Sequence, residues 1–480
     1  MIQPDFETLI IGAGFGGMTM AIKLASSGRY NFQIVEKADE VGGTWRENTY
    51  PGAECDIASA FYSYSFEPNP TWDFKWAKQK QIHEYQKGVA RKYNLYEKIR
   101  FSATVKAARF KDGFWHTELN SGEVITSRFL VPAIGQLHIP KIPEIKNASA
   151  YKGKTCHTAK WDHEIDFTDK RVAVIGNAAS AIQLIPELAE IVDQLTVYHR
   201  TPNWIIPKKD RPYSRFEKWL GAKIPMLGKL YRFSLFAQGE YFVWRIIQGK
   251  PISRWIGIKW FKSGLHKHIK DKALREKLTP DYQMGARRIL LSDKIFPALA
   301  RENVENVTSP ISRFLGEGLE TKDGAVRDHD IVVYATGFYT NPFLKDINVT
   351  GEAGQSLQTH WADGAQAYMG TMMSGFPNLF ILYGPNTNSG HCSIIFKHEH
   401  QAAYIVQLMQ KTGDRISVKP EFESEFCEEM QSRLQKLTWG KIEESWYKVG
   451  DKVTNNWPGS ALEFKRRFKT PDWDAYEISE

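Results

Sequence analysis

TLIIGAGFGG, at residues 8–17, is the most informative stretch of this 480-residue chain. Its first four residues are typical of a buried parallel strand, and the apolar residues 18–25 predict a helix that Gly28 closes. A second strand is expected at residues 32–35 and is followed directly by Glu36. Strand, glycine-rich loop, helix and second strand, in that order, predict a doubly wound α/β domain that binds a dinucleotide.

Three glycines of this loop, Gly12, Gly14 and Gly17, have separate roles in such a domain. They allow a tight turn, a close approach of a pyrophosphate to the backbone, and contact between the helix and the strand. The pyrophosphate then lies on free N–H groups at the positive end of the helix dipole. Glu36 is placed to accept hydrogen bonds from a ribose hydroxyl.

The same pattern returns at residues 171–201. The strand RVAVI precedes the loop GNAASA, and the strand after the next helix is followed by the sequence HRT. Ala178 replaces the middle glycine, and its methyl group would crowd a pyrophosphate. The residues expected to contact the second nucleotide are Gly176, Ser180, Ala181, Arg200 and Thr201.

Arg200 ends the second repeat where the first repeat carries Glu36. A carboxylate at this place repels a 2′-phosphate, whereas a guanidinium binds one. The sequence therefore favours NADP(H) over NAD(H) at the second loop, with a solvated charge at the strand end as the alternative for Arg200. One loop for each nucleotide indicates FAD at the first loop and NADP(H) at the second.

Two such repeats predict an α/β fold with two Rossmann-like dinucleotide-binding domains and a helical insertion. We expect a discontinuous FAD-binding domain over residues 1–155 and 341–480, and an NADP-binding domain over residues 156–340. The helical insert is expected at about residues 208–281. A further strand-like run is present at residues 379–383.

Aromatic and basic residues interleave in the insert, with few acids, as Trp219, Arg245, Trp255 and Lys259 illustrate. This composition suits a lid or a substrate tunnel, a helix lying on a membrane surface, or an ordinary helical subdomain. We favour the ordinary subdomain, which leaves membrane contact as the less favoured alternative.

The composition is that of an ordinary globular protein, with 42% hydrophobic and 25% charged residues. The net charge of +8 comes without a nucleic-acid-binding module, so no nucleic-acid partner is expected. We find no secretory signal and no apolar run long enough to span a bilayer. The four cysteines form no CxxC pair, which fits a reduced, cytoplasmic protein, and no metal site is expected.

Two segments resemble the motifs of one enzyme family. Residues 42–56, GGTWRENTYPGAECD, resemble the GGxWxxxxYPGxxxD element of Baeyer–Villiger monooxygenases. Residues 151–162, YKGKTCHTAKWD, resemble the FxGxxxHxxxW(P/D) fingerprint of that family, with Tyr151 in the place of the usual Phe. The residues carried over are Gly43, Thr44, Trp45 and Asp56 from the first segment, and Gly153, His157, Trp161 and Asp162 from the second.

The resemblance extends over nearly the whole chain. Residues 285–288, GARR, are similar to the family's GxKR segment, with Arg287 in the place of the Lys. Residues 335–337, ATG, match the motif that leads from the NADP domain back to the FAD domain, and Trp446 lies in a segment that resembles the C-terminal active-site loop. The residues added in this way are Arg287, Arg288, Ala335, Thr336, Gly337 and, for the substrate pocket, Trp446.

The resemblance implies a function. It implies an FAD enzyme that uses NADPH and O2 to convert a ketone or an aldehyde into an ester or a lactone through a flavin C4a-peroxide. In this scheme Arg288 stabilises the anionic oxygens, Asp56 holds the guanidinium, and His157 couples the domains without acting as an acid or a base. A structural role in the core or at the surface is the alternative for each of these residues.

Three other classes of protein share part of the pattern. A flavin monooxygenase that oxygenates nitrogen or sulfur is the main alternative, but its fingerprint usually lacks the Trp, so Trp161 and Asp162 disfavour it. A disulfide reductase shares the two nucleotide domains but needs a CxxC pair. A redox sensor would hold FAD without consuming NADPH, and it would have no use for Asp56 and Arg288.

Overall fold

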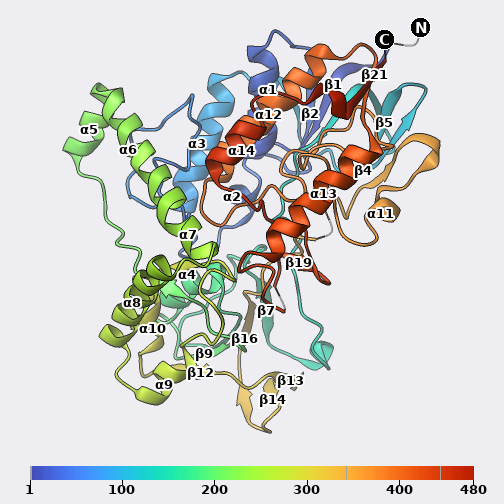
Figure 1. Cartoon of the computed structure of the whole chain (residues 1–480). Helices are drawn as coiled ribbons and strands as arrows, with labels where there is room; N and C mark the ends of the chain where they lie inside the picture. The colour runs from blue at the N-terminus through green and yellow to red at the C-terminus, as the bar shows by residue number, and fades with distance from the viewer. Residues whose placement is uncertain (1–2, 342, 444, 480) are drawn as a thin grey trace.

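The computed structural model describes residues 3–341, 343–443 and 445–479. Two sheets rich in parallel strands form its framework, one in the upper and one in the lower part of Figure 1. The first glycine loop belongs to the upper sheet and the second to the lower sheet, as the two sequence repeats predict.

The upper sheet has seven strands in the order β17-β4-β5-β6-β1-β2-β3. Strand β1 pairs in parallel with β2 on one side and with β6 on the other, while β5 runs antiparallel to both of its neighbours. The strands are β1 (Phe6–Ile11), β2 (Phe32–Val35), β3 (Ile99–Arg100), β4 (Val105–Lys111), β5 (Phe114–Leu119), β6 (Val124–Pro132) and β17 (Asn348–Thr350).

The lower sheet has five strands in the order β12-β9-β8-β16-β7, all paired in parallel. Side chains of β8 and β16, for example Val172 and Val333, are fully buried, as expected of a parallel sheet that is covered on both faces. The strands are β7 (Lys154–His157), β8 (Arg171–Ile175), β9 (Gln194–Tyr198), β12 (Val304–Val307) and β16 (Ile331–Tyr334).

Helices follow the glycine loops and pack on the sheets. Helix α1 covers residues Phe15–Ser26, so it begins three residues before the start at residue 18 that the sequence suggested. The glycines of the loop therefore belong partly to the first helical turn. The other helices around the two sheets are α2 (Thr44–Glu47), α3 (Gln79–Lys92), α4 (Ala179–Leu188), α10 (Ile295–Leu299), α11 (Leu357–His360), α12 (Ile394–Lys411), α13 (Pro420–Gln435) and α14 (Ala461–Arg467).

The strand expected at residues 379–383 is not a regular strand. Leu379 forms only an isolated parallel bridge with Leu130 of β6, and the N–H of Phe380 donates to the Leu130 carbonyl at 2.9 Å. Asn378, which precedes the run, and Tyr383, its last residue, have positive φ angles of 59° and 66°, which end the extended backbone. The smaller strands are β10 (Ile205–Ile206), β11 (Leu290–Leu291), β13 (Ile311–Phe314), β14 (Gly318–Thr321), β15 (Val326–Asp328), β18 (Arg415–Val418), β19 (Lys448–Val449), β20 (Lys452–Val453) and β21 (Tyr476–Ser479).

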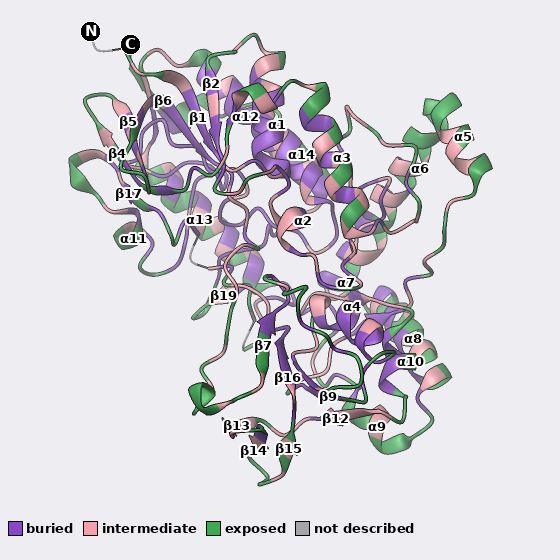
Figure 2. Cartoon of the chain, turned by 180° about the vertical axis from the view of Figure 1, so that it is seen from behind, coloured by how far each residue is buried: buried purple, intermediate pink, exposed green. Residues whose placement is uncertain are grey.

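The predicted insert is helical. The helices α7 and α8 bury part of their residues, including Trp244 and Phe261, as expected of an ordinary helical subdomain. The helices α5 and α6 bury none, and Figure 2 shows them in the colours of exposed and half-buried residues. The helical segments are α5 (Arg215–Lys223), α6 (Pro225–Gln238), a π-helical turn (Gly239–Val243), α7 (Trp244–Ile247), α8 (Pro251–His268) and α9 (Lys272–Lys277).

Two features are absent from the residues that the structure describes. None of the helices in this part of the chain has the length and apolar character needed to cross a bilayer. The same residues contain no group of three or more His, Cys, Asp or Glu side chains placed to hold a metal ion.

Candidate active site

The first glycine loop has the shape that a pyrophosphate needs. Gly12 has a φ of 104°, and a Cβ there would lie 2.9 Å from the carbonyl oxygen of Ala133. A Cβ on Gly17 would collide with the carbonyl oxygen of Gly12, so α1 packs directly on the turn. Gly14 is the N-cap of α1 and offers no side chain to the first N–H groups of the helix. These N–H groups form an anion site, and the loop therefore fits a dinucleotide.

The GGxW segment closes on this loop. The N–H of Gly42 donates to the carbonyl of Ala13 at 3.1 Å, and a Cβ on Gly14 would lie 3.7 Å from the Cα of Gly43. The helix α2 starts at Thr44, and the buried indole of Trp45 donates from Nε1 to the hydroxyl of Tyr62 at 3.0 Å. This segment is thus brought to the first glycine loop.

Glu36 is buried at the end of β2. Its carboxylate accepts hydrogen bonds from the backbone N–H groups of Ala13, at 2.6 Å, and Ala38, at 2.9 Å. The carboxylate therefore lies against the glycine loop and holds its backbone. Glu36 therefore has a structural role in the loop besides the ribose contact that the sequence predicted.

The second loop is tied to the ATG segment. Gly176 has a φ of 122°, and a Cβ there would collide with the carbonyl oxygen of Ala335. The side chain of Asn177 donates from Nδ2 to the carbonyl of Thr201 at 2.8 Å, which joins the loop to the end of β9. Arg200 is exposed beside this contact and forms no ion pair within the described part of the chain. Ser180 and Ala181 follow in the first turn of α4.

His157 links the fingerprint to the same segment. It ends β7, where it pairs with Tyr334 of β16, and its Nδ1 accepts from the N–H of Ala159 at 3.0 Å. Burial lowers the pKa of the imidazole to about 4, although the nearby carbonyl of Gly337 favours the charged form. His157 is therefore neutral at pH 7.

The other fingerprint residues make local contacts. A Cβ on Gly153 would collide with the hydroxyl of Tyr151, and it would also lie 2.6 Å from the carbonyl oxygen of Asp330. Trp161 stacks on Phe167 with ring centroids 5.1 Å apart. Asp162 accepts from the N–H of Glu164 at 2.9 Å in a turn. None of these contacts is made to Arg288 or Asp56.

Arg288 and Asp56 form the charged centre of the site. The guanidinium donates from Nε to Oδ2 at 2.7 Å and from Nη2 to Oδ1 at 2.8 Å. Burial alone raises the pKa of the Asp56 carboxyl, but the charge of Arg288 and these two hydrogen bonds outweigh it and lower that pKa. The carboxylate in turn raises the pKa of Arg288 further above its usual value. Both groups therefore stay charged at neutral pH.

The sequence did not single out three residues near this pair. The electrostatic environment of Arg288 includes the phenols of Tyr383 and Tyr447. The Tyr383 hydroxyl donates to Oδ1 of Asn388 at 2.9 Å. Lys208 is buried, forms an ion pair with Glu54, and also lowers the pKa of Asp56.

A sequence indication was available for only one of these three residues. Tyr447 is the neighbour of Trp446 in the C-terminal motif. The Trp446 side chain is partly exposed and its ring lies 4.3 Å from that of Tyr447, which is the fully buried one of the two. Tyr383 and Lys208 reach the site only through the fold.

The remaining predicted residues make contacts outside the Arg288–Asp56 pair. Arg287 places its guanidinium over the ring of Tyr282, 4.9 Å from the centroid. The Thr336 hydroxyl donates to the carbonyl of Lys141, and the N–H of Lys141 donates to the carbonyl of Gly337 at 2.9 Å. The ATG segment is therefore bonded to the chain that follows β6.

Comparisons with known proteins agree with this geometry. The pyridine nucleotide-disulphide oxidoreductase family matches residues 9–224. A Baeyer-Villiger monooxygenase of Pseudomonas aeruginosa is 36% identical over 98% of this chain and 91% of its own length, and one of Streptomyces coelicolor is 36% identical over 99% and 93%. The structure of oxidized steroid monooxygenase bound to NADP has 28% identity and a TM-score of 0.87 over 99% of both chains. That of OTEMO in complex with FAD and NADP has 25% identity and a TM-score of 0.89 over the full length of both. With its two glycine loops and its Arg288–Asp56 pair, the chain belongs to the Baeyer–Villiger monooxygenase family.

Proposed function

We propose that this protein uses NADPH and O2 to insert one oxygen atom beside the carbonyl group of a ketone or an aldehyde. A ketone, O2, NADPH and a proton would give an ester or a lactone, NADP+ and water. The observation that carries the proposal is the partly buried, bidentate pair of Arg288 and Asp56 in a chain that also carries two dinucleotide loops. The names of the relatives support the same reaction.

The bound FAD would supply the redox chemistry, taking a hydride from NADPH and activating O2. The chain contributes charge and shape. Arg288 is permanently charged and would stabilise the negative charge that develops on the carbonyl oxygen. Asp56 keeps the guanidinium in one orientation, because a bidentate pair fixes the plane of the fork.

The two tyrosines near Arg288 would act as protonated groups. Burial raises the pKa of Tyr447 to about 12 and that of Tyr383 further, even though the charge of Arg288 opposes the shift. Each phenol therefore holds its proton on Oη at neutral pH and can donate a hydrogen bond without adding negative charge. Together with the ring of Trp446, they would line the place where the substrate binds.

We assign the cofactor contacts to the residues that the sequence predicted. FAD would lie on Gly12, Gly14, Gly17, Glu36, Gly43, Thr44, Trp45 and Asp56. NADP(H) would contact Gly176, Ser180, Ala181, Arg200, Thr201, Arg287, Ala335, Thr336 and Gly337, with Gly153, His157, Trp161 and Asp162 fixing the segment beside it. The support is the cradle at each loop, where a Cβ would meet the backbone.

Two further assignments complete the proposal. We assign residues 1–155 and 341–480 to the FAD-binding domain and residues 156–340 to the NADP-binding domain. We also propose that the protein works in the cytoplasm, which is supported by its four cysteines, all of them free thiols.

A single reaction tests the function. The purified flavoprotein is given NADPH, 18O2 and a probe molecule that contains both a ketone and a thioether, and the products are identified by mass spectrometry. An ester with one 18O atom is expected. A sulfoxide as the sole product would show that the protein belongs with the enzymes that oxygenate sulfur, and the role given to Arg288 would then be wrong.

A further inference from the structure

The helices α5 and α6 form an arm that stands out from the side of the molecule, at the left of Figure 1. Neither helix buries a single residue. Five large apolar side chains of the arm are each between 55% and 66% exposed. We call these five residues the arm face: Phe216, Trp219, Met226, Leu230 and Phe233.

The arm face is ordered along the two helices. Phe216 and Trp219 are three residues apart on α5 and stack with centroids 6.0 Å apart. Met226, Leu230 and Phe233 follow at spacings of four and three residues, which places them on one side of α6. An amphipathic pattern is therefore present, but its apolar side is directed outward.

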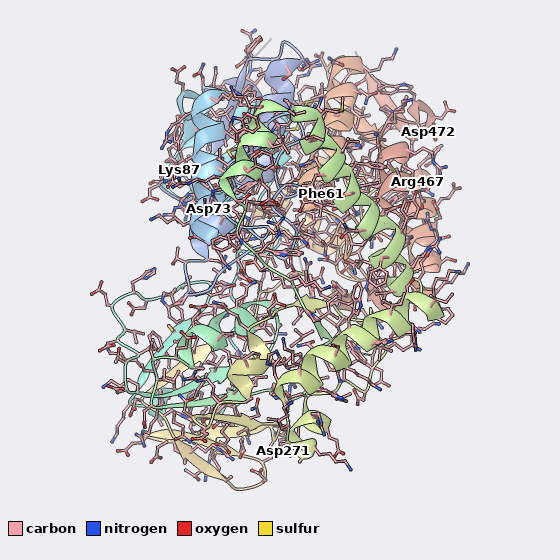
Figure 3. All side chains as sticks on the ribbon, turned by 90° about the vertical axis from the view of Figure 1, so that its left-hand side faces the viewer. Phe61, Asp73, Lys87, Asp271, Arg467 and Asp472 are labelled. Carbon is pink, nitrogen blue, oxygen red and sulfur yellow. The ribbon has the colours of Figure 1, made fainter. Side chains whose placement is uncertain are left out.

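The other side of α6 holds the arm on the protein. The guanidinium of Arg232 donates to the carbonyl of Ala60 at 2.9 Å and to the hydroxyl of Ser63 at 3.2 Å. Phe236 meets Phe61 edge to face with centroids 6.1 Å apart. Figure 3 views the molecule from the left-hand side of Figure 1 and shows Phe61 beside the helices of the insert. These contacts anchor the arm on the protein, while the arm face stays exposed to the solvent.

The positive charge of the insert indicates which kind of surface the arm face can bind. Residues 215–270 contain twelve Lys and Arg but only two acids, whereas the whole chain has a net charge of only +8. Three cations beside the arm face, Arg215, Lys223 and Lys229, are exposed and have no carboxylate within 4.0 Å among the residues that the structure describes. A second copy of the chain would bring equal positive charge against them, so self-association through this face is disfavoured. An anionic surface attracts them.

An anionic lipid surface fits both properties. Aromatic and aliphatic side chains enter the boundary between headgroups and acyl chains, while Lys and Arg extend along the same surface to reach the phosphates. The stacked Phe216 and Trp219 and the stripe on α6 supply the apolar part. Five large apolar side chains exposed on two successive helices are uncommon on a monomer that has no partner for them.

We propose that the arm face docks on an anionic lipid bilayer without crossing it. The five apolar side chains enter the interface, and Arg215, Lys223 and Lys229 contact lipid phosphates. This docking is independent of the oxygenation reaction. It would bring the protein to the phase in which apolar carbonyl compounds dissolve.

Co-sedimentation of the FAD-loaded protein with vesicles tests the proposal. One set of vesicles contains phosphatidylcholine with 30% phosphatidylglycerol, and the other contains phosphatidylcholine alone. Binding to the first set at low salt is expected to be at least tenfold tighter than to the second and to weaken in 0.5 M NaCl. Equal binding to both sets, or none to either, would overturn the proposal.

Matched variants locate the contact. The triple variant F216S/L230S/F233S and the charge variant K223E/K229E are each expected to weaken binding at least tenfold. The controls are Y30S/I142S/V326S, which removes three exposed apolar side chains elsewhere, and K322E/K411E, which makes the same charge change elsewhere. Flavin content and thermal unfolding show that each variant is folded.

Two further outcomes count against the proposal. Losses of the same size in the controls would show that the binding is not local to the arm. Sedimentation velocity without lipid detects self-association. If the unmodified chain forms a dimer that F216S/L230S/F233S abolishes, a second copy covers the arm face and the lipid proposal is wrong.

Discussion

Arg288 and Asp56 are 232 positions apart in the sequence and are joined by two parallel hydrogen bonds of 2.7 and 2.8 Å. Asp56 follows the GGxW element next to the first glycine loop, and Arg288 follows the helical insert. Folding therefore assembles a charged centre that no local segment contains. The geometry is that of a planar fork on a carboxylate, which a lysine cannot reproduce.

The fork of Arg288 is the first point to test. R288K keeps one positive charge but loses the bidentate contact, and we expect kcat to fall by about 10²–10³ while the flavin stays bound. Steady-state rates of ester formation and the flavin absorbance measure the two effects. R211K is the matched control, because Arg211 makes a similar bidentate pair with Glu217 on the surface. An R288K enzyme with the kcat of the unmodified protein would refute the electrostatic role.

The close packing of the first turn of α1 on the glycine loop can be tested with an added methyl group. G17A adds a methyl group that collides with the carbonyl oxygen of Gly12, so the helix must move away from the loop. We expect loss of most of the bound FAD and a lower Tm, measured by absorbance and calorimetry. G88A is the control, because a Cβ on Gly88 in α3 would meet no atom of the described residues within 4 Å. Full flavin content in G17A would show that the close packing of helix and loop is not required.

The preference for NADPH over NADH can be tested at Arg200. R200A removes the exposed guanidinium beside Thr201, and we expect KM for NADPH to rise by about tenfold to a hundredfold, the equivalent of about 1.5–3 kcal/mol for a charge-assisted hydrogen bond. KM for NADH should change little, because NADH has no 2′-phosphate, and it serves as the internal control. Equal increases for both cofactors would mean that Arg200 supports the fold of the loop and does not read the phosphate.

His199 predicts a pH effect on stability. Its imidazole is buried, neither ring nitrogen has a hydrogen-bond partner among the described residues, and burial lowers its pKa from 6.5 to about 4. Between these two pH values the unfolded chain binds a proton that the folded chain does not, so stability falls as the pH falls from 6.5 toward 4.

A leucine at this position cannot bind that proton. H199L is therefore expected to gain stability relative to the unmodified protein as the pH is lowered, by on the order of 1–2 kcal/mol at pH 5 compared with pH 7. Urea unfolding at the two pH values measures the difference. H163L, at an exposed position, is the control. A gain that is the same at both pH values would contradict the assignment.

The local patterns of the sequence predicted the framework well. Both strand–loop–helix repeats are present. They could be predicted because a glycine loop between a buried strand and an apolar helix is typical of a dinucleotide-binding domain. The start of α1 was misplaced, since glycines are poor indicators of a helix, and here Gly16 and Gly17 are inside one. Residues 379–383 were misjudged because the positive φ of Tyr383 depends on contacts made after folding.

The site was predicted unevenly for the same reason. The Arg288–Asp56 pair came from the family resemblance, and spacing alone does not connect two residues so far apart. Tyr383 and Lys208 were missed because their chemistry depends on neighbours that are distant in the sequence. The outward direction of the arm face was also hidden, since a helical wheel shows that an apolar side exists but not what covers it.

The contact of Arg232 with Ala60 gives the arm a short route to the carboxylate that holds Arg288. Ala60 lies four residues after Asp56, on the same loop, so the arm and the carboxylate are fastened to the two ends of one short tether. A displacement of the arm would therefore reach the partner of Arg288 through this short loop. This route would join an exposed arm to a carboxylate in the partly buried centre of the site.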